Sequence, residues 1–137
     1  MTQTQTQLEF GKFLRSGYLS FARLDLDEIE NGLAPEIQWH TPGRHPLSGT
    51  CNGIEEVKDW IRASAEMTNG TFRVDLIRIV GDRLHAAVIA TYRGERKGMT
   101  LEMPGVQTFR LDPKRNLVVE ARIFVYDDEF VNRFWSA

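Results

Sequence analysis

The second half of the chain is a series of strand-like segments separated by turn signals, and this series limits the fold more than any other feature. Apolar and polar residues alternate in two segments, as in half-buried strands: Phe72, Val74 and Leu76 in one, and Met99, Leu101 and Met103 in the other. Residues 84–93 are apolar on both faces, which predicts a central strand covered on both sides. Pro104-Gly105 predicts a bulge or bend, after which the strand resumes.

The first half of the chain and its C-terminus carry helical signals. Apolar residues recur at helical spacing over residues 8–22. Asp25 lies three residues before a glutamate, the spacing of a capping box, and Asn52 is a good N-cap for a third helix. Asp127 or Asp128 can cap a C-terminal helix. Helices followed by strands predict an α+β fold, in which helices cover one face of a bent antiparallel sheet and leave a pocket.

The length and charge of the chain exclude several classes of protein. With 137 residues, 42% hydrophobic and 26% charged, the chain suits one soluble domain at residues 8–137, preceded by a disordered polar tail at residues 1–7. The net charge of −2 and the absence of a basic patch argue against nucleic acid or an anionic membrane as a partner. No apolar run approaches the roughly 20 residues that cross a bilayer. The single cysteine, Cys51, fits a cytoplasmic location.

Residues 117–126 form the last predicted strand, and its two faces differ in chemistry. Side chains alternate across a strand, so Glu120, Arg122 and Phe124 share one face, while the residues between them are aliphatic. One interpretation places the aliphatic face in the core and the charged face in water. The other places the charged face in a ligand cavity, because large aromatic rings are poorly suited to open water. Buried charges need hydrogen-bonding partners, and Gln107 on the preceding strand is the nearest candidate.

The stretch QWHTPGRHPLSGT, residues 38–50, connects a short predicted strand at residues 37–40 to the third helix. It places His40 and His45 among prolines and glycines. An imidazole with a pKa near about 6.5 is available in either protonation state at neutral pH, so each histidine could be an acid, a base or a donor to a ligand. Alternatively, each satisfies a loop carbonyl. Zinc takes three or four converging ligands, so the spacing of these histidines supports no metal site.

Two long stretches of the chain resemble the SnoaL-like domains of the nuclear transport factor two-like superfamily. FARLDLDEIENGLAPEIQWHTPGRHPLSGTCNGIEEVKDWI is similar to their opening, with its Asp-Leu-Asp helix start, its W-H-x-P-G-x-x-P-L-x-G loop and its N-G-x-x-x-V helix. FRLDPKRNLVVEARIFVYDDEFVNRFW is similar to their ending. The resemblance implies a cone-shaped fold in which a curved antiparallel sheet wraps around helices and leaves a deep, mostly apolar pocket. It also implies a homodimer through the outer face of the sheet.

The acid–base residues of known members do not carry over to this chain. Aligning the loop with the ketosteroid isomerase pattern puts Thr41 in place of the general-base aspartate, with His40 next to it. The polyketide cyclase pattern has an acid–base aspartate on the last strand, where this chain has Ile123. The Asp-Arg-Asp set of the related epoxide hydrolases is not found either.

The oxyanion-stabilising residues carry over only in part. The tyrosine of the ketosteroid isomerase pattern falls on Gly17, one position from Tyr18. The aspartic acid of that pattern falls on Gln107, whose amide can still donate a hydrogen bond. The same resemblance directs three side chains of the last strand into the cavity: Glu120, Arg122 and Phe124.

The residues and the resemblance together predict a protein that binds a small molecule and uses neither a cofactor nor a metal. We expect acid–base chemistry on an apolar, carbonyl-bearing compound such as a polyketide or a steroid-like ring. The expected catalytic residues are His40, His45, Glu120, Arg122 and Gln107. The expected ligand-binding residues are Tyr18, Trp39, Thr41, Met103, Phe109 and Phe124. The alternative is a non-catalytic, dimeric module that binds a hydrophobic metabolite.

Overall fold

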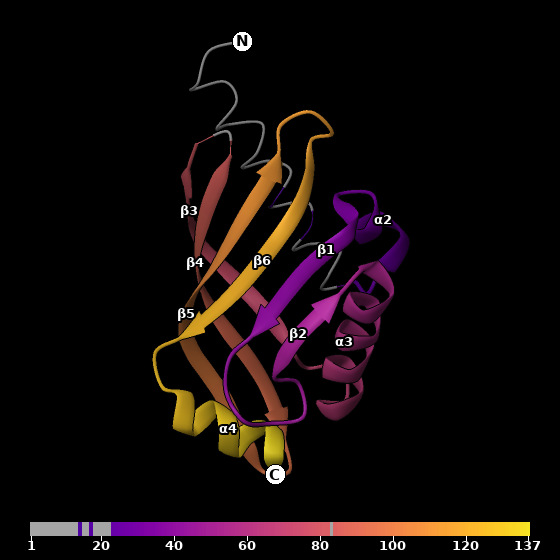
Figure 1. The fold of residues 1–137 in the computed structure, drawn as a ribbon. Coiled ribbons are helices and arrows are strands. Elements are labelled where there is room, and N and C mark those ends of the chain that lie inside the picture. Colours follow the sequence, from indigo (N-terminus) through magenta and orange to yellow (C-terminus); the bar gives the residue numbers. More distant parts are fainter. Residues whose placement is uncertain (1–13, 15–16, 18–22, 83) are drawn as a thin grey trace.

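The structure is a computed structural model that describes residues 14, 17, 23–82 and 84–137. In this part of the chain, three helices pack against a curved, six-stranded sheet that does not close into a barrel, as the predicted α+β fold requires (Figure 1). The predicted tail at residues 1–7 lies outside the described residues. The helix predicted at residues 8–22 does too, apart from Leu14 and Gly17, which are both helical.

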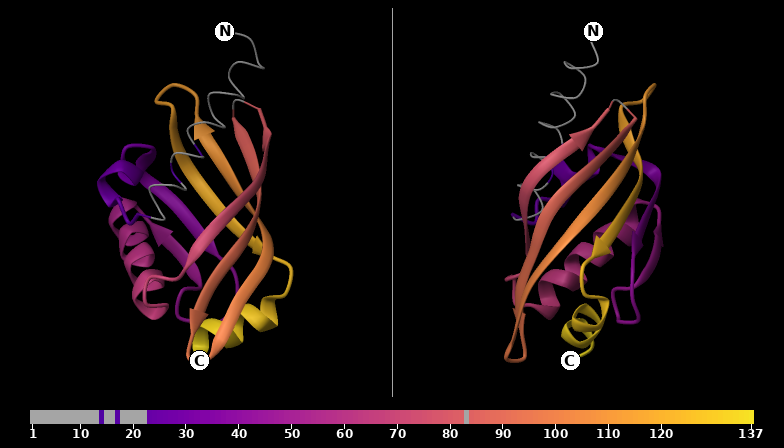
Figure 2. Two further views of the ribbon diagram at one scale, coloured as in Figure 1. Left: turned by 180° about the vertical axis from the view of Figure 1, so that it is seen from behind. Right: turned by 90° about the vertical axis from the view of Figure 1, so that its left-hand side faces the viewer.

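The strand order across the sheet is β2-β1-β6-β5-β4-β3. Adjacent strands run antiparallel except β1 and β6, which run parallel, so the expected all-antiparallel sheet is wrong at that pair. Figures 1 and 2 show α3 beside β1 and β2, and α4 across one end of the sheet. The elements are α2 (Leu26–Glu30), β1 (Leu33–Thr41), β2 (Gly49–Asn52), α3 (Ile54–Met67), β3 (Arg73–Gly81), β4 (His85–Arg96), β5 (Met99–Asp112), β6 (Leu117–Val125) and α4 (Asp128–Ser136).

Two of the predicted helix caps form and one does not. The Asp25 carboxylate accepts a hydrogen bond from the backbone of Glu28 at 3.2 Å at the start of α2. Asp127 caps α4 in the same way, so of the two predicted candidates, Asp127 and Asp128, the first is the N-cap. The prediction for Asn52 is wrong, because this residue ends β2, a strand that the sequence did not predict, and Gly53 occupies the N-cap of α3.

Strand β5 runs through Pro104 and Gly105 without a register shift, so the predicted bulge there is wrong. Residue 105 is a glycine because a side chain at this position would clash with its neighbours. A Cβ on Gly105 would lie 2.6 Å from Cε2 of Tyr92 and 2.5 Å from the carbonyl oxygen of Phe124. The irregularity lies further along, where the pairs Arg110↔Glu120 and Leu111↔Val118 leave one extra residue in β6.

The alternation of buried and exposed residues in β6 is regular after the extra residue. Val118, Ala121 and Ile123 are buried, while Arg122 and Phe124 are exposed and Glu120 is half-buried. The expectation that Glu120, Arg122 and Phe124 point into a cavity is therefore wrong, and the interpretation with the aliphatic face inside is confirmed. Burying the aliphatic face removes apolar surface from water and leaves both charges hydrated, which is the arrangement of lower free energy.

The core lies between the inner face of the sheet and helices α3 and α4. Its fully buried side chains come from both layers and include Ile37, Val57, Ile61, Val88, Val118 and Phe134. The outer face of β4 is uncovered in this chain, since Ile89 is 36% exposed, so the strand is not covered on both sides as expected. Among the helices of the described residues, none is long and apolar enough to cross a bilayer.

Candidate functional site

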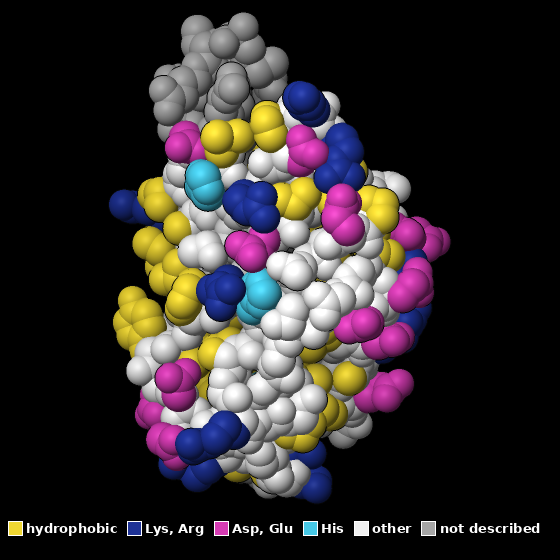
Figure 3. Space-filling view, in the orientation of Figure 1, with side chains coloured by type: hydrophobic (Ala, Val, Ile, Leu, Met, Phe, Trp, Pro, Cys, Tyr) yellow, Lys and Arg dark blue, Asp and Glu magenta, His cyan; other side chains and the backbone are white. Residues whose placement is uncertain are grey.

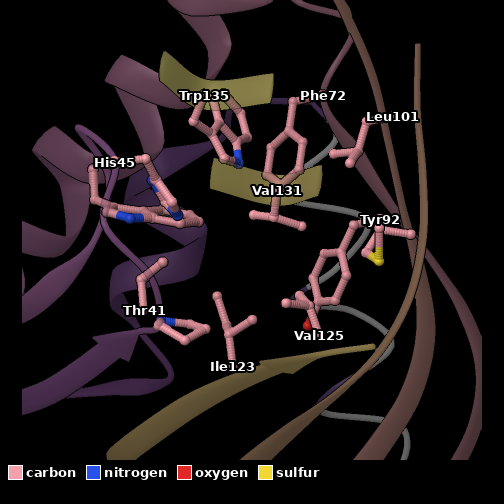
Figure 4. Close-up of a pocket in the computed structure, with 12 residues that line it drawn as sticks. Thr41, His45, Phe72, Tyr92, Leu101, Ile123, Val125, Val131 and Trp135 are labelled. Carbon is pink, nitrogen blue, oxygen red and sulfur yellow. The ribbon is translucent and has the colours of Figure 1, made fainter. Parts of the chain in front are cut away.

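A small hollow lies between the inner face of the sheet and the two long helices (Figure 4). Its cavity volume is about 30 Å³, and about 390 Å³ of space free of protein atoms, open solvent included, lies in and around it. No Asp, Glu, Lys or Arg of the described chain lines it. Most of its wall is aromatic or aliphatic, including Trp60, Phe72, Leu101, Met103, Ile123 and Trp135.

Three polar atoms in this apolar wall lack hydrogen-bond partners among the described residues. They are Oγ1 of Thr41, Nε2 of His45 and the hydroxyl of Tyr92, and all three atoms are buried. In Figure 4, Thr41 and His45 lie on one side of the hollow, and Tyr92 lies across from them. A buried polar group without a partner costs about 1–3 kcal/mol, so the hollow is suited to a ligand or water that pairs with these atoms.

The loop between β1 and β2 holds the imidazole of His45 in place. Ser48 Oγ accepts from the backbone N–H of His45 at 2.7 Å, and the backbone N–H of Leu47 donates to Nδ1 of His45 at 3.2 Å. Helix α4 supports the same loop, since Asn132 accepts from the backbone N–H of Arg44 at 2.7 Å.

These contacts also determine which nitrogen of His45 carries the proton. Nδ1 accepts the Leu47 N–H, so in the neutral ring the proton is on Nε2. Burial lowers the pKa of His45, and the nearby Pro42 carbonyl offsets this only in part. His45 is therefore a neutral hydrogen-bond donor toward the hollow at neutral pH, and its Nε2 is not a free base.

Tyr92 supplies the second donor. Its ring extends from β4 over Gly105, and the absence of a side chain at that glycine leaves room for it. Burial raises the pKa of Tyr92 far above its ordinary value, so the hydroxyl keeps its proton. Two neutral donors on opposite sides of an apolar hollow favour an uncharged ligand that carries hydrogen-bond acceptors.

His40 lies on the outer face of β1, away from the hollow. Its Nε2 is 3.2 Å from Oε2 of Glu120, and its Nδ1 is 2.9 Å from Oγ1 of Thr50. Because a carboxylate only accepts, Nε2 donates to Glu120, and Nδ1 shares a hydrogen bond with the Thr50 hydroxyl. Arg110 approaches the second oxygen of Glu120 at 4.0 Å. This chain of contacts ties neighbouring strands together across the sheet.

The structure therefore separates the residues that the sequence grouped into one site. His45, Thr41 and Met103 line the hollow, whereas His40, Glu120, Arg122 and Phe124 face outward. Gln107 is buried on the inner face between Val88 and Ile123, outside the lining of the hollow. Trp39 and Phe109 are buried in the core, and Tyr18 lies outside the described residues.

Sequence reasoning missed Tyr92 as a site residue. The available signal was its position near the end of an apolar strand, where it brings a polar tip into an otherwise apolar face. Trp60 and Trp135, predicted only to pack helices, also line the hollow. No group of three or more His, Cys, Asp or Glu in the described part of the chain could hold a metal ion.

Comparison with known proteins identifies close likenesses in sequence and in fold. The family model described as "SnoaL-like domain" matches residues 14–120. An uncharacterised protein of Mycobacterium tuberculosis is 32% identical over 91 residues, which are 65% of this chain and 69% of that protein.

Solved structures show the same fold. Bal32a, from a soil-derived mobile gene cassette, superposes with a TM-score of 0.89 at 24% identity, covering 95% of this chain and 98% of that one. An NTF2-like protein of unknown function from Burkholderia pseudomallei K96243 superposes with a TM-score of 0.81 at 23% identity, covering 92% and 96%. With its curved sheet, its three helices and this match over most of its length, the chain belongs to the SnoaL-like family and has the NTF2-like fold.

Proposed function

We propose that this protein binds a small, uncharged, carbonyl-bearing compound in the hollow and donates hydrogen bonds to the ligand oxygen. The observation that carries the proposal is the set of buried atoms without partners among the described residues: Thr41 Oγ1, His45 Nε2 and the Tyr92 hydroxyl. The apolar wall supports a hydrocarbon or aromatic body for the ligand.

Binding is better supported than proton abstraction. Abstraction next to a carbonyl needs a base, and the described lining of the hollow contains no carboxylate. His45 cannot supply one at Nε2, because Nδ1 accepts the Leu47 N–H and the proton is on Nε2.

A catalytic role is the second candidate, and the two donors favour it. Neutral donors in a dry site stabilise the negative charge that develops on a carbonyl oxygen during enolisation, as oxyanion holes do. In this version, His45 and Tyr92 stabilise the enolate of a ligand whose proton leaves to water or to a group of its own. The reaction would be a cofactor-free isomerisation or cyclisation.

A pair of isosteric ligands tests the binding proposal. Acetophenone has a carbonyl where α-methylstyrene has a methylene group, so a net hydrogen bond should make acetophenone bind about two- to tenfold more tightly. Tyr92→Phe and Thr41→Val should reduce this preference, while Glu120→Gln, on the outer face, should leave it unchanged. Binding can be followed by the fluorescence of Trp60 and Trp135. Equal affinities for both ligands in the unaltered protein would refute the proposal.

Exchange of the acetophenone methyl protons in D₂O separates the two candidates. Simple binding leaves the exchange rate at its buffer value. Catalysis accelerates it, and Tyr92→Phe and His45→Gln should each remove the acceleration. The exchange is measured by proton NMR with the protein present at substoichiometric concentration.

We further propose that two copies of this chain pair through the outer face of the sheet. Ile89, Val106 and Phe124 lie in one row across three adjacent strands, and Ile89 and Phe124 are 36% and 49% exposed. Figure 3 shows this side of the molecule, with hydrophobic side chains along its left-hand edge and histidines and charged side chains next to them. A second copy would remove this apolar row from water, and the same patch on both copies suits a two-fold dimer.

A further inference from the structure

A second, open groove lies on the outer face of the sheet and shares part of its wall with the hollow. It contains about 430 Å³ of space free of protein atoms, including open solvent. Thr41, Pro42 and Ile123 line both the groove and the hollow. The other described residues of the groove are His40, Gly49, Thr50, Arg122 and Phe124.

The pairing of β1 with β6 ends beside the residues that the groove and the hollow share. Strand β1 ends at Thr41, and its last pair with β6 is His40↔Arg122. Strand β6 continues to Val125 and beyond Arg122 is paired only with β5. The chain after β1 turns away toward α4, where Asn132 holds it (Figure 1). Thr41, Pro42 and Ile123 therefore separate the hollow from the groove at the end of β1, and a ligand that occupied both would run past these three residues.

Arg122 is the arginine in the lining of this groove, and its guanidinium has no ion-pair partner among the described residues. Neighbouring Glu120 is held by His40 at 3.2 Å and lies 4.0 Å from Arg110, whereas Arg122 forms no ion pair or side-chain hydrogen bond with the described residues. No Asp or Glu of the described chain lines the groove. A guanidinium in such a site prefers a carboxylate, to which it can donate two parallel hydrogen bonds.

We propose that the ligand is an apolar keto acid whose carbonyl end lies in the hollow and whose carboxylate lies on Arg122 in the groove. This inference rests on the proposed binding function, since it assigns the second end of the same ligand. Arg122 is then a specificity-determining residue: it selects for a charged end that the hollow itself excludes.

Butyrophenone and 4-oxo-4-phenylbutanoate test the proposal, because both are aryl ketones and only the second has a carboxylate. A charge-assisted hydrogen bond at a half-open site should make the acid bind about tenfold more tightly at low salt, and 0.5 M NaCl should reduce this preference. Arg122→Gln should abolish the preference and leave the affinity for butyrophenone unchanged. Arg78→Gln, which removes an exposed arginine on β3, is the matched control and should retain the preference.

The outcomes distinguish the two proposals. If both ketones bind the unaltered protein equally well, Arg122 is not a carboxylate site and the binding function stands. A preference for the acid that survives Arg122→Gln also overturns the inference, because another group then binds the carboxylate. If neither compound binds, the proposed function fails and this inference fails with it.

Discussion

Tyr92 and Gly105 are diagonal neighbours on adjacent strands, since Tyr92 pairs with Met103 and Gly105 with Ala90, and the ring of Tyr92 occupies the space that a side chain at residue 105 would need. A Cβ there would lie 2.6 Å from Cε2 of Tyr92. This contact links an element of the fold, an uninterrupted β5, to the position of one of the two donors of the hollow. Gly105, which in the sequence predicted an interruption of the strand, therefore makes room for a side chain of the candidate site.

Gly105→Ala should destabilise the protein by about 1–3 kcal/mol, because the new methyl group overlaps the Tyr92 ring and the carbonyl oxygen of Phe124. Chemical denaturation measures the change in the free energy of unfolding. Gly94→Ala is the matched control: this glycine is also in a strand and buried, yet its nearest contact would be an ordinary 3.4 Å. Equal effects of the two substitutions would show that the Tyr92 ring moves aside without penalty.

Tyr92→Phe should leave the stability of the ligand-free protein unchanged or raise it by up to about 1 kcal/mol. The hydroxyl is buried without a partner among the described residues, so its removal takes away an unsatisfied group and no contact. Thermal unfolding of both proteins gives the comparison. A loss above about 1 kcal/mol would mean that the hydroxyl is already hydrogen-bonded in the ligand-free protein.

The stability of the protein should fall as the pH is lowered below about 6.5, and His45 should contribute to that fall. Burial lowers the pKa of His45 in the folded state, so between that pKa and the unfolded value near 6.5 the unfolded chain binds more protons. The free energy of unfolding therefore decreases as the pH is lowered through this window. Above about pH 6.5 both states are neutral and the contribution of this residue vanishes.

Denaturant titrations between pH 5 and pH 8 check this dependence. His45→Gln cannot be protonated and should show a shallower decrease than the unaltered protein. His85→Gln serves as the control for the loss of an imidazole, because His85 is exposed on the outer face of the sheet, away from the hollow. Identical slopes for the His45 variant and the unaltered protein would contradict the prediction.

Ile89→Lys should convert the proposed dimer into a monomer, because it places a charge in the middle of the apolar row that would be buried between two copies. Light scattering coupled to size-exclusion chromatography gives the mass. Leu24→Lys introduces the same charge at a residue that is 46% exposed just before α2, away from the sheet, and should leave the mass unaltered. A monomer in the unaltered protein would rule out the pairing.

Much of the fold could be predicted from local patterns in the sequence. Alternation in β3 and β5, the carboxylate caps at Asp25 and Asp127, and the resemblance to SnoaL-like domains all indicated elements that the structure contains. These signals depend on neighbours within a few residues, so a sequence carries them directly.

The face of β6 that turns inward was decided by tertiary structure. The alternation by itself favoured the aliphatic face inward, whereas Phe124 and the resemblance to ketosteroid isomerases favoured the charged face inward. Desolvation then selects the aliphatic face, because Glu120 and Arg122 retain water only on the outside.

By itself, the amino-acid sequence determined the fold class, most of the strands, the caps of two helices and the family, since each follows from short-range periodicity or from a recognisable motif. Only the tertiary structure decided that Thr41, His45 and Tyr92 face one hollow and that His40 and Glu120 do not. The partners of a side chain depend on strand register, on a hydrogen bond from Leu47 and on the space left by Gly105, and each of these joins residues that only folding brings together.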